Sequence, residues 1–157
     1  MTLLNAPGYD ERKENRKRNL LVGSGIFILL AAVIGVGGYL LGHGWFFSNI
    51  PAEHRVSQFL TALEQKDYKK AYGIWENDPD WQQHPQKYDY TLQRFTEDWT
   101  TESDWGPITS HHVDISKRTG TGTIVAVTVN HSPKKMFMWY ERSNGTLTYP
   151  APYNLEY

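Results

Sequence analysis

The chain has 157 residues, with 16 Lys and Arg against 17 Asp and Glu. The first 49 residues hold 5 of the basic and 3 of the acidic residues, so the 11 and 14 that remain make the rest mildly acidic. Nucleic-acid binding needs a clustered basic face, which this balance argues against. Cysteine is absent, which excludes disulfides, thiolate metal sites and cysteine nucleophiles.

An apolar stretch, LLVGSGIFILLAAVIGVGGYLL, occupies residues 20–41 and contains no charged residue. As a helix rising about 1.5 Å per residue, it is long enough to cross roughly 30 Å of hydrocarbon. A cleaved signal peptide has a shorter apolar core, of about 7 to 15 residues, and ends in a small-x-small cleavage site. We therefore expect a retained transmembrane helix over residues 20–42.

A basic cluster precedes this stretch, whereas Arg55 is the first basic residue after it. The cluster consists of Arg12, Lys13, Arg16, Lys17 and Arg18. The positive-inside rule then predicts a single-pass protein with residues 1–19 in the cytoplasm and the rest exported. We expect the basic tail to be disordered or loosely helical.

Four small residues of the expected helix follow one another at spacings of four, three and four: Ala31, Gly35, Gly38 and Gly42. This spacing places them on one face, where small side chains let a second helix approach closely. Glycine is also common in membrane helices without such a role. We expect this face to pack against a helix of another protein.

An interfacial linker is expected over residues 43–52. The aromatic residues Tyr39, Trp45, Phe46 and Phe47 are predicted to lie at the outer headgroup level, which favours amphipathic rings. His43 could bind a haem or chlorophyll there, but most residues at such a position are merely interfacial. We predict no cofactor.

Residues 53–149 are expected to form one exported domain that begins with three helices. The first follows the spacing of Val56, Phe59, Leu60 and Leu63. Asp67 is predicted to cap a second helix that ends before Pro79. A third is predicted from Tyr88 to Trp99.

The spacing of apolar residues changes to two after Gly106, which is typical of strands. Val113 and Ile115 are expected on one face of the first strand, with His112 and Asp114 on the other. Further strands are predicted over residues 124–129, 136–142 and 146–149, as an antiparallel meander. The fold class is therefore α+β, with the helices on one face of the sheet. Residues 150–157 are expected to form an extended tail.

The stretch FLTALEQKDYKKAYGIW at residues 59–75, and the passage from Phe95 to Ile108, resemble small membrane-anchored bacterial domains of the NTF2-like (cystatin-like) family. The resemblance covers about residues 51–149. It implies about three helices packed on a curved four-stranded sheet, forming a cone in the periplasm beside the bacterial inner membrane. NTF2-like enzymes carry acid/base Asp and His residues inside this cone.

The polar residues that could carry such chemistry are Asp98, His111, His112, Asp114 and His131. His111 and His112 are adjacent, so on a strand they point to opposite faces and cannot share a metal. Asp98 with one histidine could form an acid/base pair. An exposed helix face and strand-surface histidines are the simpler interpretation, so we predict no catalytic, cofactor-binding or metal residues and no enzyme.

The expected function is that of a non-catalytic accessory subunit. We expect the helix and the exported domain to contact the lipid bilayer and larger membrane subunits, in a respiratory or photosynthetic energy-transducing complex. Two alternatives stay open. One is a tethered module that binds a small ligand or peptide in a pocket of several hundred Å³ lined by Tyr and Trp. The other is an NTF2-like enzyme that uses Asp98 and a histidine.

Overall fold

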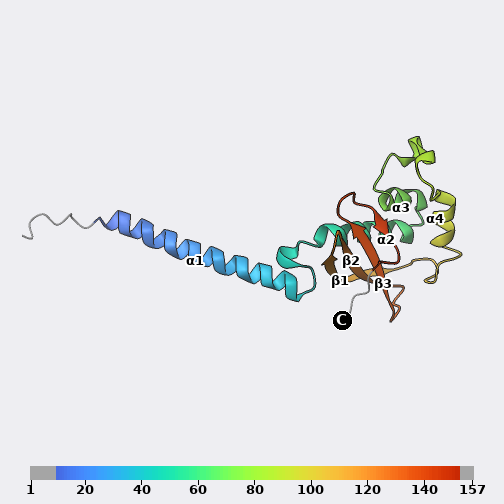
Figure 1. Ribbon diagram of the computed structural model, residues 1–157. Coiled ribbons are helices and arrows are strands. Elements are labelled where there is room, and N and C mark those ends of the chain that lie inside the picture. Colours follow the sequence, from blue (N-terminus) through green and yellow to red (C-terminus); the bar gives the residue numbers. More distant parts are fainter. Residues whose placement is uncertain (1–9, 153–157) are drawn as a thin grey trace, which may run out of the picture.

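A long helix, α1 (Glu11–Leu40), extends away from an α+β unit that contains all the other elements (Figure 1). This structure is a computed structural model that describes residues 10–152. Among these, α1 is the one helix long and apolar enough to cross a membrane. The predicted α+β class is confirmed.

Helix α1 starts earlier and ends slightly earlier than expected. The Asp10 carboxylate accepts hydrogen bonds from the backbone N–H groups of Arg12 and Lys13, both at 3.1 Å, and so caps the helix at Glu11. The basic cluster thus lies in regular helix, the helical one of the two states expected for the tail. At the other end Gly42 has φ +82°, a left-handed conformation that terminates helices, so it lies outside α1.

Three further α-helices follow: α2 (Ile50–Glu64), α3 (Tyr68–Trp75) and α4 (Leu92–Asp98). The Asp67 side chain accepts from the N–H of Lys70 at 3.0 Å, which confirms the predicted cap of α3. The expected start of α4 at Tyr88 is wrong. Thr91 Oγ1 accepts from the N–H of Arg94 at 3.2 Å and caps the helix there.

Short 3₁₀ turns join these helices: η2 (Trp45–Phe47), η3 (Trp81–Gln83) and η4 (Pro85–Lys87). The first of them folds back against α1. The expected linker over residues 43–52 therefore has its own structure and also contains the start of α2.

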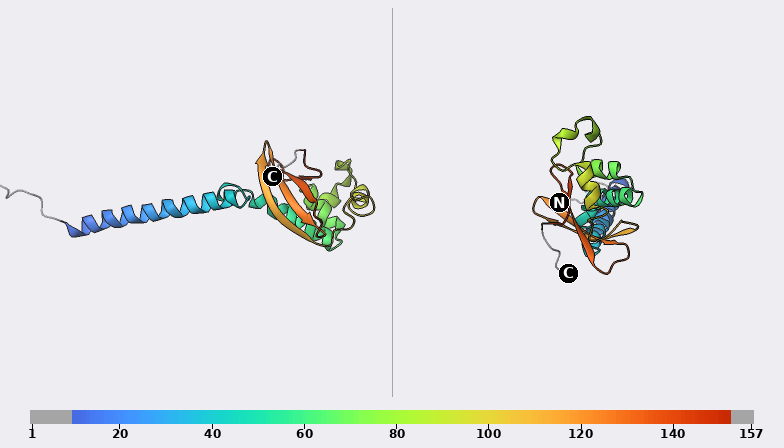
Figure 2. Two further views of the ribbon diagram at one scale, coloured as in Figure 1. Left: turned by 90° about the horizontal axis from the view of Figure 1, so that it is seen from below. Right: turned by 90° about the vertical axis from the view of Figure 1, so that its right-hand side faces the viewer.

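The sheet is an antiparallel meander in the order β1 (His111–Thr119), β2 (Gly122–Val129), β3 (Lys135–Glu141) and β4 (Leu147–Thr148). As expected, alternate β2 residues face opposite sides: Val125 and Val127 pack with the helices, whereas Ile124 and Ala126 belong to a second cluster on the other face. The helices pack on the first of these faces (Figure 2).

One expected face is wrong. Val113 pairs with Val127 and Ile115 with Ala126, so the register shifts by one residue at Asp114. Such a β-bulge turns the residues that follow it to the other face. Val113 accordingly packs against the helices, and Ile115 joins the cluster on the opposite face.

The core between helices and sheet is filled with rings. Phe59 and Phe95 are fully buried, and Phe95 contacts Phe59, Tyr72, Trp75 and Trp99 at centroid distances of 5.4–6.3 Å. Most of these contacts are edge-to-face, the arrangement that aromatic quadrupoles favour. The interior expected of an open cone is thus largely occupied by the domain's own side chains.

Candidate functional site

A cleft of about 480 Å³ opens at the margin of this aromatic core, beside α4. Aromatic residues form its inner wall: Trp75, Tyr90, Trp99, Trp105 and Tyr149. Polar residues form its rim: Arg94, Asp98, Glu102, Ser103 and Asp104. The volume lies within the range of about 300–1,000 Å³ that is usual for ligand sites.

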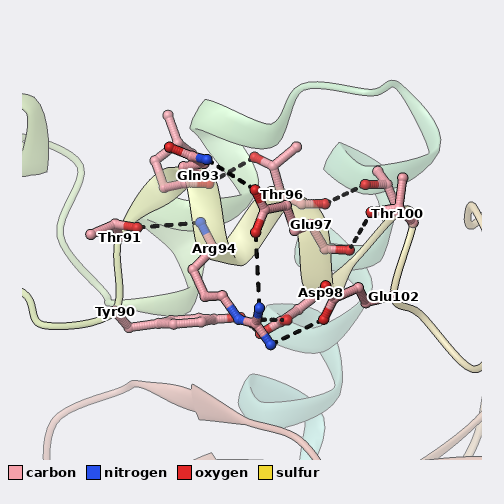
Figure 3. Close-up of polar contacts among 11 residues, drawn as sticks. Tyr90, Thr91, Gln93, Arg94, Thr96, Glu97, Asp98, Thr100 and Glu102 are labelled. Carbon is pink, nitrogen blue, oxygen red and sulfur yellow. Dashed lines mark hydrogen bonds and ion pairs between the residues drawn. The ribbon is translucent and has the colours of Figure 1, made fainter.

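Helix α4 positions the rim. Arg94 and Asp98 are four residues apart and so lie on the same side of the helix, where Arg94 Nε is 3.1 Å from Asp98 Oδ1. Tyr90 precedes the helix cap, and its hydroxyl donates to Asp98 Oδ2 at 2.9 Å (Figure 3). Arg94 Nη2 also lies 3.0 Å from Glu102 Oε2, which joins the helix to the loop that follows.

The rim carries an excess of negative charge. Arg94 is its one cation, against the carboxylates of Asp98, Glu102 and Asp104. Burial, and then the hydrogen bond to Asp98, raises the pKa of Tyr90 above its ordinary value. Tyr90 therefore remains a neutral donor at physiological pH and adds no charge of its own.

The aromatic wall is held by contacts among its own members. Trp105 Nε1 donates to the Tyr149 hydroxyl at 2.8 Å, and the Tyr149 ring lies 5.8 Å from that of Trp99. Lys134 Nζ lies 5.3 Å from the centre of a Trp105 ring. One face of the wall thus already attracts a cation, as expected of an electron-rich indole.

This arrangement suits binding better than acid/base chemistry. No histidine is among the residues that line the cleft, and the side-chain partners of Asp98 are Tyr90 and Arg94. The structure therefore does not assemble the pair of Asp98 with a histidine that was left open above. Aromatic faces with nearby carboxylates form a suitable environment for an ammonium or guanidinium group.

The other candidate polar residues lie elsewhere. Asp114 accepts from Lys135 Nζ at 2.9 Å and from Thr128. His112 and His131 are exposed on the sheet and in a turn. No group of three or more His, Asp or Glu residues that could hold a metal occurs within residues 10–152.

His111 belongs to a cluster that sequence reasoning missed. Its Nδ1 lies 2.6 Å from Glu64 Oε1, and its Nε2 lies 2.9 Å from Ser57 Oγ. This is the order of groups in a Ser-His-acid triad. Ser57, however, lies inside α2, where neighbouring N–H groups bond to carbonyls four residues earlier and cannot form an oxyanion hole beside it. The cluster instead ties α2 to β1.

A second group of contacts fixes the end of α1 to the domain, and we call it the junction. The N–H of Ser116 donates to the Gly42 carbonyl at 2.7 Å, and Asn49 Nδ2 donates to the Ser116 carbonyl at 3.2 Å. Glu53 Oε1 accepts from Ser116 Oγ at 2.5 Å and from His43 Nδ1 at 2.8 Å. His43, considered above as a pigment ligand, thus has one ring nitrogen engaged by a carboxylate.

The small-residue face and the predicted interfacial rings meet within the chain. A Cβ atom on Gly35 would lie 2.9 Å from the Phe46 ring, and one on Gly38 would lie 2.6 Å from the Gly44 carbonyl and 2.7 Å from Phe47 N. Gly35 and Gly38 are accordingly buried, and Ala31 is half-buried. This part of the face, expected to pack against a helix of another protein, is covered by the chain's own loop.

Three of the four predicted rings, Phe46 among them, stay more than half exposed. Tyr39 and Trp45 stack at a centroid distance of 5.2 Å and are more than half exposed.

Searches against family models, curated proteins and solved structures found no match to the chain. The site must therefore be interpreted from its own geometry.

Proposed function

We propose that the chain is a non-catalytic, single-pass accessory protein of a bacterial inner membrane. In this proposal α1 spans the bilayer, the basic cluster keeps the N-terminus in the cytoplasm, and the α+β domain lies on the periplasmic side. The length and apolarity of α1 and the one-sided placement of basic residues support it. The succession of three helices and a four-stranded meander also supports an NTF2-like assignment of the domain.

The domain, in this proposal, binds a basic segment of a larger membrane subunit in the aromatic cleft. The single observation that carries it is the combination of an aromatic wall with a rim in which three carboxylates outnumber one arginine. A lysine or arginine side chain could place its charge near Asp98 and Glu102 and its aliphatic stem against the rings.

The junction supports a function in which the domain is held at a fixed distance from the membrane. It holds the end of α1 to α2 and β1 through backbone and side-chain hydrogen bonds. The cleft lies beside α4, at the end of the domain remote from α1 (Figure 1). A partner segment bound there would be held at a fixed height above the membrane.

Purification of the full chain in a mild detergent tests this function. We expect larger membrane subunits to co-purify in stoichiometric amounts, and the double variant Asp98→Asn/Glu102→Gln to lose them while remaining folded and inserted. The double variant Asp80→Asn/Asp89→Asn has the same change in charge at exposed positions outside the cleft and should retain them. A lone monomer or homodimer would contradict the accessory role.

A further inference from the structure

A second cavity, of about 530 Å³, lies at the junction between the end of α1 and the edge strand β1. Its lining combines rings, an aliphatic side chain and two cations: Tyr39, Trp45, Ile115, Lys117 and Arg118. It is distinct from the aromatic cleft, since no residue lines both.

The apolar side of this cavity is prearranged. Tyr39 and Trp45 stack on each other, and Ile115 lies close against Gly42, where an added Cβ would be 2.7 Å from its Cγ2 atom. Gly42 and Gly44 both have positive φ, which permits the tight turn that brings Trp45 back beside Tyr39. The stacked pair presents an amphipathic surface of the kind that favours the membrane interface.

The polar side carries uncompensated positive charge. Lys117 and Arg118 are consecutive and exposed on the edge strand β1, so their side chains leave it on opposite faces and flank the cavity. Neither forms an ion pair with any residue in the part of the chain that the structure describes. Across the rest of this lining there is no carboxylate. A phosphate group could therefore bind here without first displacing an acidic side chain.

The cavity also lies at the right depth for a lipid. About 20 helical residues cross the hydrocarbon core, so a span that enters at Leu20 leaves it near Tyr39. The rings of the cavity then lie at the outer interface, with the two cations on the domain that lies beyond it (Figure 1). This placement rests on the proposed membrane topology.

We propose that the junction cavity binds one anionic phospholipid of the outer leaflet. Lys117, on the same face of β1 as Ile115, binds its phosphate, and Arg118 attracts the anionic headgroup from the other face of this edge strand. Tyr39 and Trp45 contact the glycerol and the first acyl carbons. Two basic residues near an anionic surface together favour binding of an anionic lipid over a zwitterionic one by a factor of roughly thirty.

Site-specific photo-crosslinking of the full chain in nanodiscs tests this proposal. One photoreactive amino acid replaces Ser48, an exposed residue that lines the cavity, and a second replaces Leu30 in the middle of α1. The nanodiscs contain phosphatidylcholine and phosphatidylglycerol at four to one, and mass spectrometry identifies each lipid adduct. We expect adducts at position 48 to be strongly enriched in phosphatidylglycerol, and those at position 30 to follow the bulk composition.

The double variant Lys117→Gln/Arg118→Gln should reduce the enrichment at position 48 to the bulk ratio. Its matched control is Lys69→Gln/Lys70→Gln on α3, which removes two exposed lysines remote from the cavity and should preserve the enrichment. Equal enrichment in the wild type and in the Lys117/Arg118 variant would overturn the lipid site.

Three further outcomes distinguish this proposal from related explanations. Loss of the enrichment when soluble glycerol phosphate is added would overturn the lipid in favour of a free phosphate ester. Absence of lipid adducts at position 30 would overturn the membrane topology itself, and with it the lipid site. Adducts at position 30 without enrichment at position 48 would overturn the lipid site alone.

Discussion

The two ends of the α+β domain use aromatic residues in opposite ways. At the junction, Phe46 and Phe47 cover glycines of the same chain, and backbone atoms approach so closely that a single added carbon would clash. At the cleft, Trp105 and Tyr149 are only partly buried and line about 480 Å³ of open space. Phe46 and Phe47 therefore hold the loop against α1, whereas Trp105 and Tyr149 remain available to a ligand.

Charge separates the two ends as well. The carboxylate of Glu53 at the junction has two partners from its own chain, at 2.5 and 2.8 Å. At the cleft, Arg94 pairs with Asp98 and Glu102, and Asp104 adds a third carboxylate. Glu53 therefore already has its hydrogen-bond partners, whereas a cationic ligand could neutralise the excess negative charge of the cleft.

The largest effect is expected from Phe95→Ala, which removes the ring at the centre of the aromatic core. Phe95 is fully buried among five other rings, so the variant should lower the free energy of unfolding by about 3–5 kcal/mol. Chemical denaturation followed by tryptophan fluorescence measures this loss. Leu92→Ala, at a half-buried position of the same helix, should cost clearly less. Equal losses would mean that the core does not centre on Phe95.

Gly38→Ala should break the junction and leave the cleft intact. The new Cβ would meet backbone atoms of Gly44 and Phe47, which cannot rotate away, so we expect a cost of about 1–3 kcal/mol. Hydrogen exchange should accelerate at the amide of His43, which donates to the Gly38 carbonyl, and at that of Ser116, which donates to the nearby Gly42 carbonyl.

The neighbouring change Gly37→Ala is the matched control, because a Cβ there has nothing within 4 Å outside its own helix. It should leave exchange unchanged or stabilise α1 slightly, since alanine is the better helix former. If both variants accelerate exchange equally, the close contact at Gly38 does not hold the junction.

A smaller effect is expected at low pH from Asp78, in the loop before α4. Hydrogen bonds from Tyr88 and from His84 lower the pKa of Asp78 from 3.8 to about 2. Because the folded pKa is below the unfolded one, this stabilisation is complete above pH 3.8 and is lost as the pH falls through 2. Melting temperatures should therefore fall less steeply between pH 4 and 2 in Asp78→Asn than in the wild type or Asp80→Asn. Identical slopes in all three would contradict the account.

Signals within a few residues predicted most of the secondary structure. Asp67 caps α3 as expected, and the alternation of Val125, Ala126 and Val127 assigned both faces of β2. Two predictions, the start of α4 and the face of Ile115, were wrong for local reasons. The apolar spacing of Tyr88 fits a helix, but Thr91 supplies the cap, and the extra residue at Asp114 turns Ile115 to the opposite face.

The contacts that define the junction and the His111 cluster depend on residues far apart in the sequence. His111 is 54 residues from Ser57, and Ser116 is 74 residues from Gly42. No periodicity links such positions, although Ser57 and Glu64 already share one helix face through their spacing of seven. The contact of Phe46 with Gly35 could not be predicted either. It depends on positive φ at Phe46 and Phe47, a conformation that phenylalanine rarely adopts.

Binding at the cleft can be measured directly on the full chain. With indole nitrogens labelled, NMR follows Trp105 at the cleft and Trp45 at the junction during titration with a short arginine peptide and with its glutamate counterpart. We predict a saturable shift of the Trp105 signal with the arginine peptide alone, no shift of Trp45, and no response in Asp98→Asn/Glu102→Gln. An unmoved Trp105 signal, or equal shifts with both peptides, would contradict the proposed recognition of a basic segment.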